Sequence, residues 1–201
     1  MIHRTEITGL ILAGGRGMRM GQVNKGLQTM QGKTMVEHVI ARMRPQVNRL
    51  IINANQDIDR YRQFTELVFQ DNITDYPGPL AGLECGLMHC QTRYLLSAPC
   101  DSPFLPTNLA ERLAIAMLNE GTQVAVPVTE ELQDGKLKQQ TQPVFCLLQA
   151  DLHSHLYKFL QQDGRKISDW LDQLRVSEVV FDNNEEFRNI NTKAELDTFA
   201  L

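Results

Sequence analysis

The chain has 201 residues, a formal net charge of −4, 42% hydrophobic residues and 22% charged residues. This length suits one domain with a proper core, and the composition is that of an ordinary soluble globular protein. The negative charge excludes a general attraction to nucleic acid or to an anionic membrane, so a polyanion would need a local cluster of cations. The apolar run Leu10 to Ala13 is too short for a signal peptide or a membrane span, and we therefore expect a cytoplasmic protein.

Strand-like and helix-like segments alternate through the first half of the chain. Apolar residues recur at helical spacing from Met35 to Met43 and stop before Pro45, and a turn signal at 76–79 precedes a second helical segment. We expect strands at 7–12, 50–52, 67–69 and 93–98, and helices at 35–43 and 80–90.

The second half continues the same alternation. We expect helices at 108–119, 152–160, 167–174 and 193–199, and strands at 124–128, 144–148 and 179–181. The segment "TEELQDGKLKQQTQ" (129–142) is interpreted as a polar loop. Strands separated by helices imply one α/β domain, with a mostly parallel central sheet and helices on both faces.

The four cysteines do not predict a metal site. They form no C-x-x-C pair, and no histidine lies at zinc-ligand spacing from two of them. We expect buried free thiols at Cys85, Cys90, Cys100 and Cys146.

Ligands of parallel sheets bind beyond the carboxyl ends of the strands. Four such ends carry polar or glycine residues: "LAGG" (12–15), "NAN" (53–55), "QD" (70–71) and "PCD" (99–101). We expect the ligand site at this edge.

The glycines after the first strand allow main-chain N–H groups to approach an anion, and Arg16, Arg19 and Lys25 add full charges. A tight turn with solvated basic residues is the alternative. A Walker P-loop is excluded because Lys25 is followed by Gly26, and a dinucleotide fingerprint is weak because Met20 replaces its third glycine. A nucleotidyltransferase loop, which holds a triphosphate, is the third interpretation.

Nucleotidyl transfer from a triphosphate needs a divalent cation, and Mg²⁺ needs a carboxylate at the active face. Asp101 follows the strand "YLLSAP" directly, and Asp71 also lies at a strand end. A helix cap or an Asx-turn is the alternative role for Asp101.

These pieces together resemble the molybdenum cofactor guanylyltransferases, which attach GMP to molybdopterin. The resemblance is collinear over nearly the whole chain, and only the combination of motifs is specific. It is carried by "LAGGRGMRMGQVNKGL" (12–27), "NAN" (53–55), "DYPGPLAGL" (75–83), "PCDSPFLP" (99–106), "QPVF" (142–145) and "NINTKAEL" (189–196).

The resemblance implies a single Rossmann-like, three-layer domain that binds GTP with Mg²⁺, or Mn²⁺ in its place, and releases pyrophosphate. It implies a nucleotide-binding half (1–105) and a pterin-acceptor half (106–201). Lys25, Arg19 and Asp101 are the implied catalytic residues, with Asp101 the metal ligand. The implied GTP contacts are Leu12, Ala13, Gly14, Gly15, Lys25, Asn53, Asp71, Gly82 and Asp101, and the implied pterin contacts are Gln142, Asn189 and Asn191.

Two positions depart from the family pattern. Asn24 replaces the usual aspartate before the lysine, which keeps the hydrogen bonding but removes a charge, and Gly17 replaces a small hydroxyl residue or alanine. Cytidylyltransferases of the same fold are the nearest alternative. Their first loop resembles "LAAG", whereas this chain has "LAGG" (12–15). The side chain missing at Gly14 would leave room for a purine.

A GTP-binding module or cofactor carrier that has lost turnover is a third interpretation, with Asn24 as a sign of decay. The resemblance also implies transient contacts with molybdenum-insertion proteins and molybdoenzyme chaperones. We expect no nucleic-acid or membrane partner, and a monomer.

Overall fold

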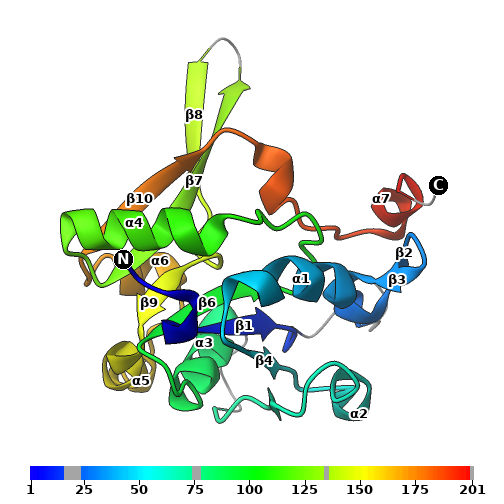
Figure 1. Ribbon diagram of the computed structural model, residues 1–201, viewed down its shortest axis with the longest axis horizontal. Helices are drawn as coiled ribbons and strands as arrows, with labels where there is room; N and C mark the ends of the chain where they lie inside the picture. The colour runs from blue at the N-terminus through cyan, green and yellow to red at the C-terminus, as the bar shows by residue number, and fades with distance from the viewer. Residues whose placement is uncertain (16–23, 74–77, 134–135, 200–201) are drawn as a thin grey trace.

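The computed structural model describes residues 1–15, 24–73, 78–133 and 136–199 (Figure 1). Its strands in the main sheet are β1 (Ile7–Leu12), β4 (Arg49–Asn53), β5 (Val68–Phe69), β6 (Tyr94–Pro99), β7 (Val124–Gln133), β8 (Lys136–Thr141), β9 (Leu147–Gln149) and β10 (Val176–Phe181). The sheet has the order β10-β7-β9-β6-β1-β4-β5, and β8 pairs with β7. A separate hairpin joins β2 (Thr29–Met30) to β3 (Lys33–Thr34).

The sheet is mostly parallel, as predicted. Strands β6, β1, β4 and β5 run parallel, and so do β10 and β7. Strand β9 lies antiparallel between β6 and β7. The carboxyl ends of β1, β4, β5 and β6 therefore meet at one edge of the sheet.

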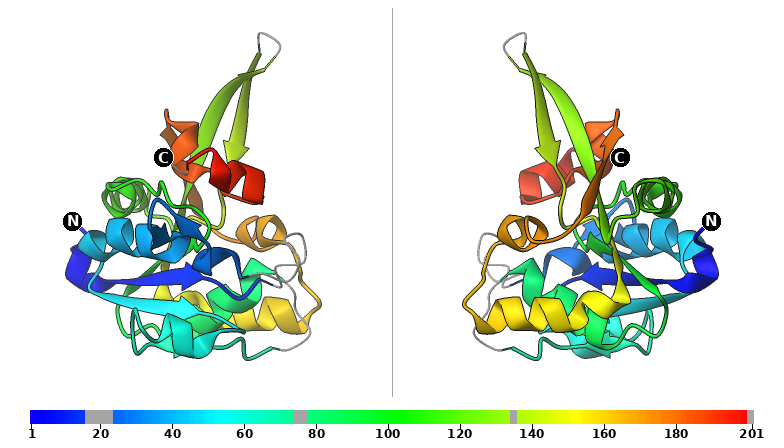
Figure 2. Two further views of the ribbon diagram at one scale, coloured as in Figure 1. Left: turned by 90° about the vertical axis from the view of Figure 1, so that its right-hand side faces the viewer. Right: turned by 90° about the vertical axis from the view of Figure 1, so that its left-hand side faces the viewer.

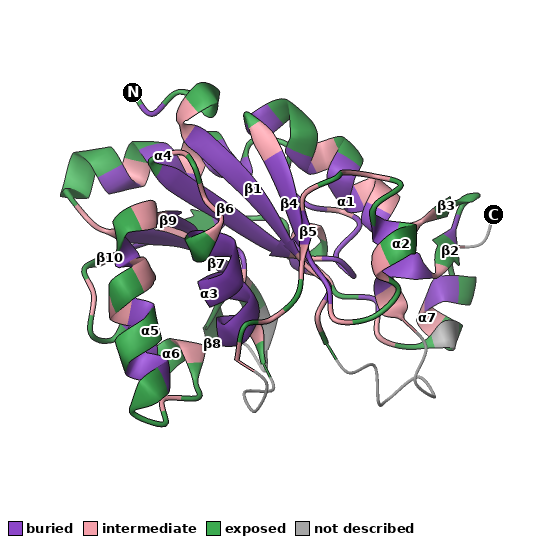
Figure 3. Ribbon diagram, turned by 90° about the horizontal axis from the view of Figure 1, so that it is seen from below, coloured by how far each residue is buried: buried purple, intermediate pink, exposed green. Residues whose placement is uncertain are grey.

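Helices cover both faces of the sheet (Figures 2 and 3). They are α1 (Met35–Met43), α2 (Ile58–Tyr61), α3 (Pro79–Met88), α4 (Leu109–Glu120), α5 (His153–Gln161), α6 (Ile167–Leu171) and α7 (Lys193–Asp197), with 3₁₀ turns η1 (Arg4–Glu6), η3 (Lys25–Leu27), η4 (Arg44–Gln46), η5 (Ala150–Leu152) and η6 (Asn184–Phe187). Helices α1 and α4 lie on one face, and α3, α5 and α6 on the other (Figure 3). None of the helices in these described ranges is long and apolar enough to cross a membrane.

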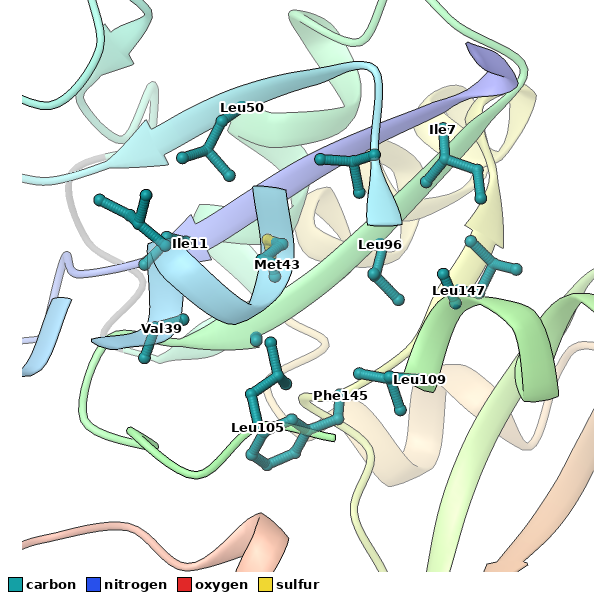
Figure 4. Packing of buried hydrophobic residues seen from close by; sticks show 14 of the residues in the cluster. Ile7, Ile11, Val39, Met43, Leu50, Leu96, Leu105, Leu109, Phe145 and Leu147 are labelled. Atoms are coloured by element: carbon teal, nitrogen blue, oxygen red, sulfur yellow. The ribbon is translucent and has the colours of Figure 1, made fainter. Parts of the chain in front are cut away.

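The two faces of the sheet have separate cores because strand side chains alternate between them. On β1, Ile7 and Ile11 point toward α1 and α4, whereas Leu10 points toward α3. Figure 4 shows the first core, where Val39 and Met43 of α1 pack against the strands.

The segment 129–142 is not a loop, and that prediction was wrong. Strand β7 continues to Gln133 and β8 returns from Lys136, so the segment forms a two-stranded hairpin that projects from the body (Figures 1 and 2). The projecting parts of both strands are mostly polar and lie outside the two cores, whereas residues 124–128 of β7 are apolar and belong to the body of the sheet. The Asp134-Gly135 pair between them is a hairpin signal in the sequence that the interpretation passed over.

Smaller differences lie at element ends. The strand expected at 144–148 is shorter and lies later, at Leu147–Gln149, and the helix expected at 167–174 ends at Leu171. The short helix α2 and the β2–β3 hairpin were not predicted. All four cysteines are free thiols as expected; Cys85, Cys100 and Cys146 are buried, whereas Cys90 is only half-buried.

Candidate nucleotide site and adjoining pocket

Hydrogen bonds that continue past the strand ends bring the predicted site residues together. The Ala13 N–H donates to the Asn53 carbonyl at 2.7 Å, and the Cys100 N–H donates to the Leu12 carbonyl at 3.0 Å. The ends of β1, β4 and β6 are thereby held in register. Gly14, Asn53 and Asp101, which come from three separate parts of the sequence, lie at one edge as expected.

A carboxylate and two amides form a closed network at this edge. Asn53 Nδ2 donates to Asp71 Oδ1 at 2.8 Å, and Asn55 Nδ2 donates to Asp71 Oδ2 at 2.7 Å. Each carboxylate oxygen thus has one amide partner. Asn53 is buried, and Asp71 and Asn55 are half-buried, so the network faces the edge of the sheet with its carboxylate oriented in advance.

Gly14 and Gly82 allow this network to pack tightly. A Cβ at Gly14 would lie 2.8 Å from Asn53 Oδ1 and 2.9 Å from Asn55 Nδ2, both too close. A Cβ at Gly82 on α3 would lie 2.6 Å from Asn53 Oδ1 and 2.6 Å from Leu12 Cδ2. Two asparagine amides therefore occupy the space beside Gly14. Close packing against these amides, and not room for a purine, explains why a side chain is absent at this position.

Lys25 connects this edge to the second half of the chain. Its ammonium donates to Asn191 Oδ1 at 2.6 Å and lies 3.4 Å from Asp101 Oδ2. Lys25 starts η3, and a Cβ on the next residue, Gly26, would lie 2.9 Å from Cys100 Sγ. This close packing fixes the lysine beside the end of β6.

Asp101 is 9% exposed. Burial raises the pKa of its carboxyl group, and the nearby Lys25 ammonium partly lowers this pKa again. A second cation would stabilise the ionised form of this buried carboxyl group. Burial also raises the pKa of the neighbouring Cys100 thiol to about 12, so the thiol stays protonated and is a poor metal ligand. Within the described ranges, no three His, Cys, Asp or Glu residues gather into a metal cluster.

The segment with Asn189 and Asn191 is anchored directly at Asp101. The Ile190 N–H donates to the Asp101 carbonyl at 2.9 Å, and the Ile190 side chain is fully buried. The Ser102 hydroxyl donates to Asn189 Oδ1. The two asparagines flank this anchor, so the strand end at Asp101 positions them both.

A polar pocket of about 450 Å³ lies beside this anchor. It contains all three predicted pterin residues, together with one face of the hairpin. Thr129 and Glu131 of β7 pair with Gln140 and Lys138 of β8, and alternation along both strands places these four side chains in the wall. The lining residues are Thr129, Glu131, Lys138, Gln140, Gln142, Asn184, Glu185, Phe187, Arg188, Asn189 and Asn191.

The hairpin wall, Asn184 and Arg188 were missed by sequence reasoning. A period of two in residues 129–131 and 138–142 was the available signal, but it is weak where both strand faces are polar. Arg188 pairs with Glu185 at 3.0 Å, so the pocket carries charges of both signs.

Asn24 has a structural explanation. Its Nδ2 donates to Asp57 Oδ2 at 3.1 Å, and its Oδ1 accepts from the Tyr61 hydroxyl at 2.7 Å. Burial raises the pKa of Tyr61, which keeps the donor protonated. An aspartate at position 24 could not donate to Asp57 and would place two carboxylates together.

Arg16, Gly17 and Arg19 lie outside the described residues, so their predicted roles are untested. Gly15 is exposed beside Gly14. The structure thus brings together Leu12, Ala13, Gly14, Asn53, Asp71 and Gly82 at one end, Lys25, Asp101 and Asn191 at the junction, and Gln142, Asn189 and Asn191 in the pocket.

Several known proteins are similar to this chain in sequence or in fold. Residues 9–178 match the family described as the MobA-like NTP transferase domain. The molybdenum cofactor guanylyltransferases of Ralstonia nicotianae and Ralstonia pickettii are 51% and 50% identical to this chain, over 100% of it and 98% of each relative.

A solved structure with the same fold is the molybdopterin-guanine dinucleotide biosynthesis protein A from Archaeoglobus fulgidus. It has a TM-score of 0.73 and 22% identity, and it covers 96% of both chains. The fold, the glycine-bearing strand end and identity near one half over the full length lead to one assignment: this chain belongs to the MobA-like NTP transferases, within the family of molybdenum cofactor guanylyltransferases.

Proposed function

We propose that the protein transfers GMP from GTP to the terminal phosphate of molybdopterin, forming the guanine dinucleotide cofactor and pyrophosphate. One observation carries the proposal. The Lys25 ammonium touches both Asp101, at the strand-end edge, and Asn191, in the lining of the pocket. A cation between two sites suits a reaction that joins two phosphate groups.

The guanine base is proposed to bind at the Asp71 carboxylate. Guanine presents two adjacent donors, N1–H and the 2-amino group, and a carboxylate accepts two such bonds side by side. Asn53 and Asn55 each use one bond to Asp71, which leaves further acceptor capacity on both oxygens. Cytosine lacks this pair of donors, so the network favours a guanylyl donor over a cytidylyl donor.

The triphosphate is proposed to lie along the glycine loop toward Lys25. Main-chain N–H groups of Gly14 and Gly15, the Arg19 guanidinium and the Lys25 ammonium supply donors for its oxygens. Lys25 would keep its bond to Asn191 and turn its remaining N–H donors from Asp101 to phosphate oxygens. These groups stabilise the charge that builds on the leaving pyrophosphate.

The residues present fit a Mg²⁺ ion that binds together with the nucleotide. Mg²⁺ usually takes one or two protein carboxylates plus substrate phosphates and waters, so the single buried carboxylate of Asp101 suffices. The ion, or Mn²⁺ in its place, would neutralise phosphate charge during transfer.

The pocket is proposed to hold the pterin acceptor. Its polar donors and acceptors, among them Gln142, Asn189 and Asn191, suit a large polar ligand, and Arg188 offers a cation for an anionic group.

The acceptor phosphate is already ionised near neutral pH, so its oxygen can attack the α-phosphorus of GTP without a strong base. The bond from that phosphorus to the bridging oxygen breaks, and pyrophosphate leaves. Positioning therefore dominates the rate.

Calorimetry with Mg²⁺ and GTP, CTP, ATP or UTP tests the donor, followed by pyrophosphate release with molybdopterin. We expect tightest binding of GTP and pyrophosphate release only with both substrates. A preference for CTP would move the protein to cytidylyl transfer. Binding of GTP without turnover would instead indicate a carrier.

We also propose that the protein acts as a cytoplasmic monomer that passes its product to cofactor-insertion proteins and molybdoenzyme chaperones. Light scattering of the purified chain, with and without GTP, tests the oligomeric state. A mass of twice 22.9 kDa would contradict it.

A further inference from the structure

Asn55 at the strand-end edge uses its amide oxygen and its amide nitrogen in hydrogen bonds. Its Nδ2 donates to Asp71 Oδ2 at 2.7 Å and to the Gly14 carbonyl at 3.0 Å. Its Oδ1 accepts from the Asp71 N–H at 2.9 Å. Both amide hydrogens and the amide oxygen are therefore used, with two of the bonds on Asp71 and one on Gly14.

These bonds fix Asp71 in two ways. One holds the carboxylate at Oδ2 and the other holds the main chain of the same residue, so neither the side chain nor its backbone can turn without breaking a bond. Asn53 adds a bond to Oδ1 at 2.8 Å. A carboxylate held in advance loses little conformational freedom when it accepts two donors from a base.

The bond to the Gly14 carbonyl joins Asp71 to the glycine loop. Asn55 is half-buried and lies against Gly14 so closely that a Cβ there would come within 2.9 Å of its Nδ2. The base-reading carboxylate and the first residues of the phosphate loop are thus held by one amide group.

We propose that Asn55 is a positioning residue that sets the selectivity for guanine over purines that lack its 2-amino group. This inference rests on the proposed function, in which Asp71 reads the base. Inosine keeps N1–H but lacks the 2-amino donor, so it can make only one of the two bonds to Asp71. The gain from the second bond depends on the carboxylate orientation that Asn55 maintains.

Binding of GTP and ITP with Mg²⁺, measured by calorimetry, tests this role. We expect the wild-type chain to bind GTP about tenfold or more tightly than ITP, from one additional hydrogen bond to a charged group. Asn55→Ala should reduce this ratio to about threefold or less, mainly by weakening GTP. A purely structural role would weaken both nucleotides equally.

Two further variants make the test independent of folding losses. Asn55→Asp keeps the side-chain shape but replaces both donors with acceptors beside Asp71, so it should also reduce the ratio. Asn48→Ala removes an exposed asparagine that directly precedes β4, at the end of the strand away from Asn53, and should leave the ratio of GTP to ITP affinity unchanged.

The outcomes separate the two proposals. A wild-type ratio retained in both Asn55→Ala and Asn55→Asp would overturn the role of Asn55 while leaving guanylyl transfer intact. A wild-type chain that binds CTP or ATP as tightly as GTP would overturn the proposed function, and the role of Asn55 with it.

Discussion

The Asp71 network, which is proposed to bind the base, and the pocket, which is proposed to hold the acceptor, hold their polar groups in different ways. At the network, Asp71, Asn53 and Asn55 bond to one another over distances of 2.7 to 2.9 Å, at the ends of adjacent strands. In the pocket, the polar groups come from a projecting hairpin and from residues 184–191. A small planar base suits fixed partners, whereas a larger acceptor suits a wall assembled from several segments. Lys25 and Asp101 lie between the two.

Asp101→Asn gives the largest expected effect, because it removes the proposed metal ligand at the junction. Transfer should fall by about 100-fold or more, or about 3 kcal/mol of barrier. Pyrophosphate release at saturating GTP and Mg²⁺ measures it. Near-normal turnover would remove Asp101 from the catalytic machinery.

The same variant should keep or raise the Tm of the unliganded protein at pH 7. Burial raises the Asp101 pKa, so its favourable contribution to folding exists below the ordinary pKa of Asp and is lost as the pH rises through the higher folded value. The neutral amide avoids this loss. Scanning calorimetry at pH 5 and 7 checks the sign, and a fall of several degrees at pH 7 would contradict it.

Lys25→Ala should affect both regions at once. Transfer should fall by about 100-fold through the lost phosphate contact, and the acceptor KM should also rise because Asn191 loses its donor. Asp101→Asn does not remove that donor, so the two variants differ in acceptor KM. Lys33→Ala, an exposed lysine on β3, is the matched control. An unchanged acceptor KM would separate Lys25 from the pocket.

Asn191→Ala should act mainly on the acceptor side. We expect the acceptor KM to rise by about tenfold, the scale of one hydrogen bond to a charged group, and the GTP affinity to change less. Steady-state kinetics with each substrate varied in turn measures both. Asn119→Ala, on the exposed face of α4, is the control. A larger effect on GTP would place Asn191 on the nucleotide side.

Asn24→Asp should give the smallest effect, confined to stability. It replaces a hydrogen bond to Asp57 with like-charge repulsion, worth about 0.5 kcal/mol at an exposed site. Urea unfolding at low salt measures the loss. Adding Asp57→Asn should restore the stability, whereas a persistent loss in the double variant would assign it to the Tyr61 contact.

The sequence predicted the strand-end edge better than the pocket for a physical reason. Asn53 ends an apolar strand and Asp71 and Asp101 follow one closely, and parallel strands bring such ends to one edge whatever their separation in sequence. The alternation of strands and helices therefore fixed both the fold and this edge. The contact between Asn24 and Asp57 could not be predicted in the same way, because Asp57 itself has a left-handed backbone conformation just before α2.

The pocket depends on features that leave little trace in a sequence. Apart from the paired Leu132 and Leu137, the hairpin is polar, so residues 129–142 lack the apolar alternation that marks a strand with one buried face. Asn189 and Asn191 were identified by resemblance alone. Their placement depends on the hydrogen bond from the Ile190 N–H to the Asp101 carbonyl. These two residues are separated in sequence by nearly the whole second half of the chain.

The hydrogen bond between Lys25 and Asn191 joins residues 166 positions apart. During synthesis, β1, α1 and β4 leave the ribosome long before residues 189–191, and the intervening strands can assemble around them. The junction, however, gains its last member only when this late segment docks at the end of β6. A chain that ended before residue 189 would lack the Asn191 partner of Lys25 and the Ile190 bond to Asp101, so the contact between the strand-end edge and the pocket is the last to form.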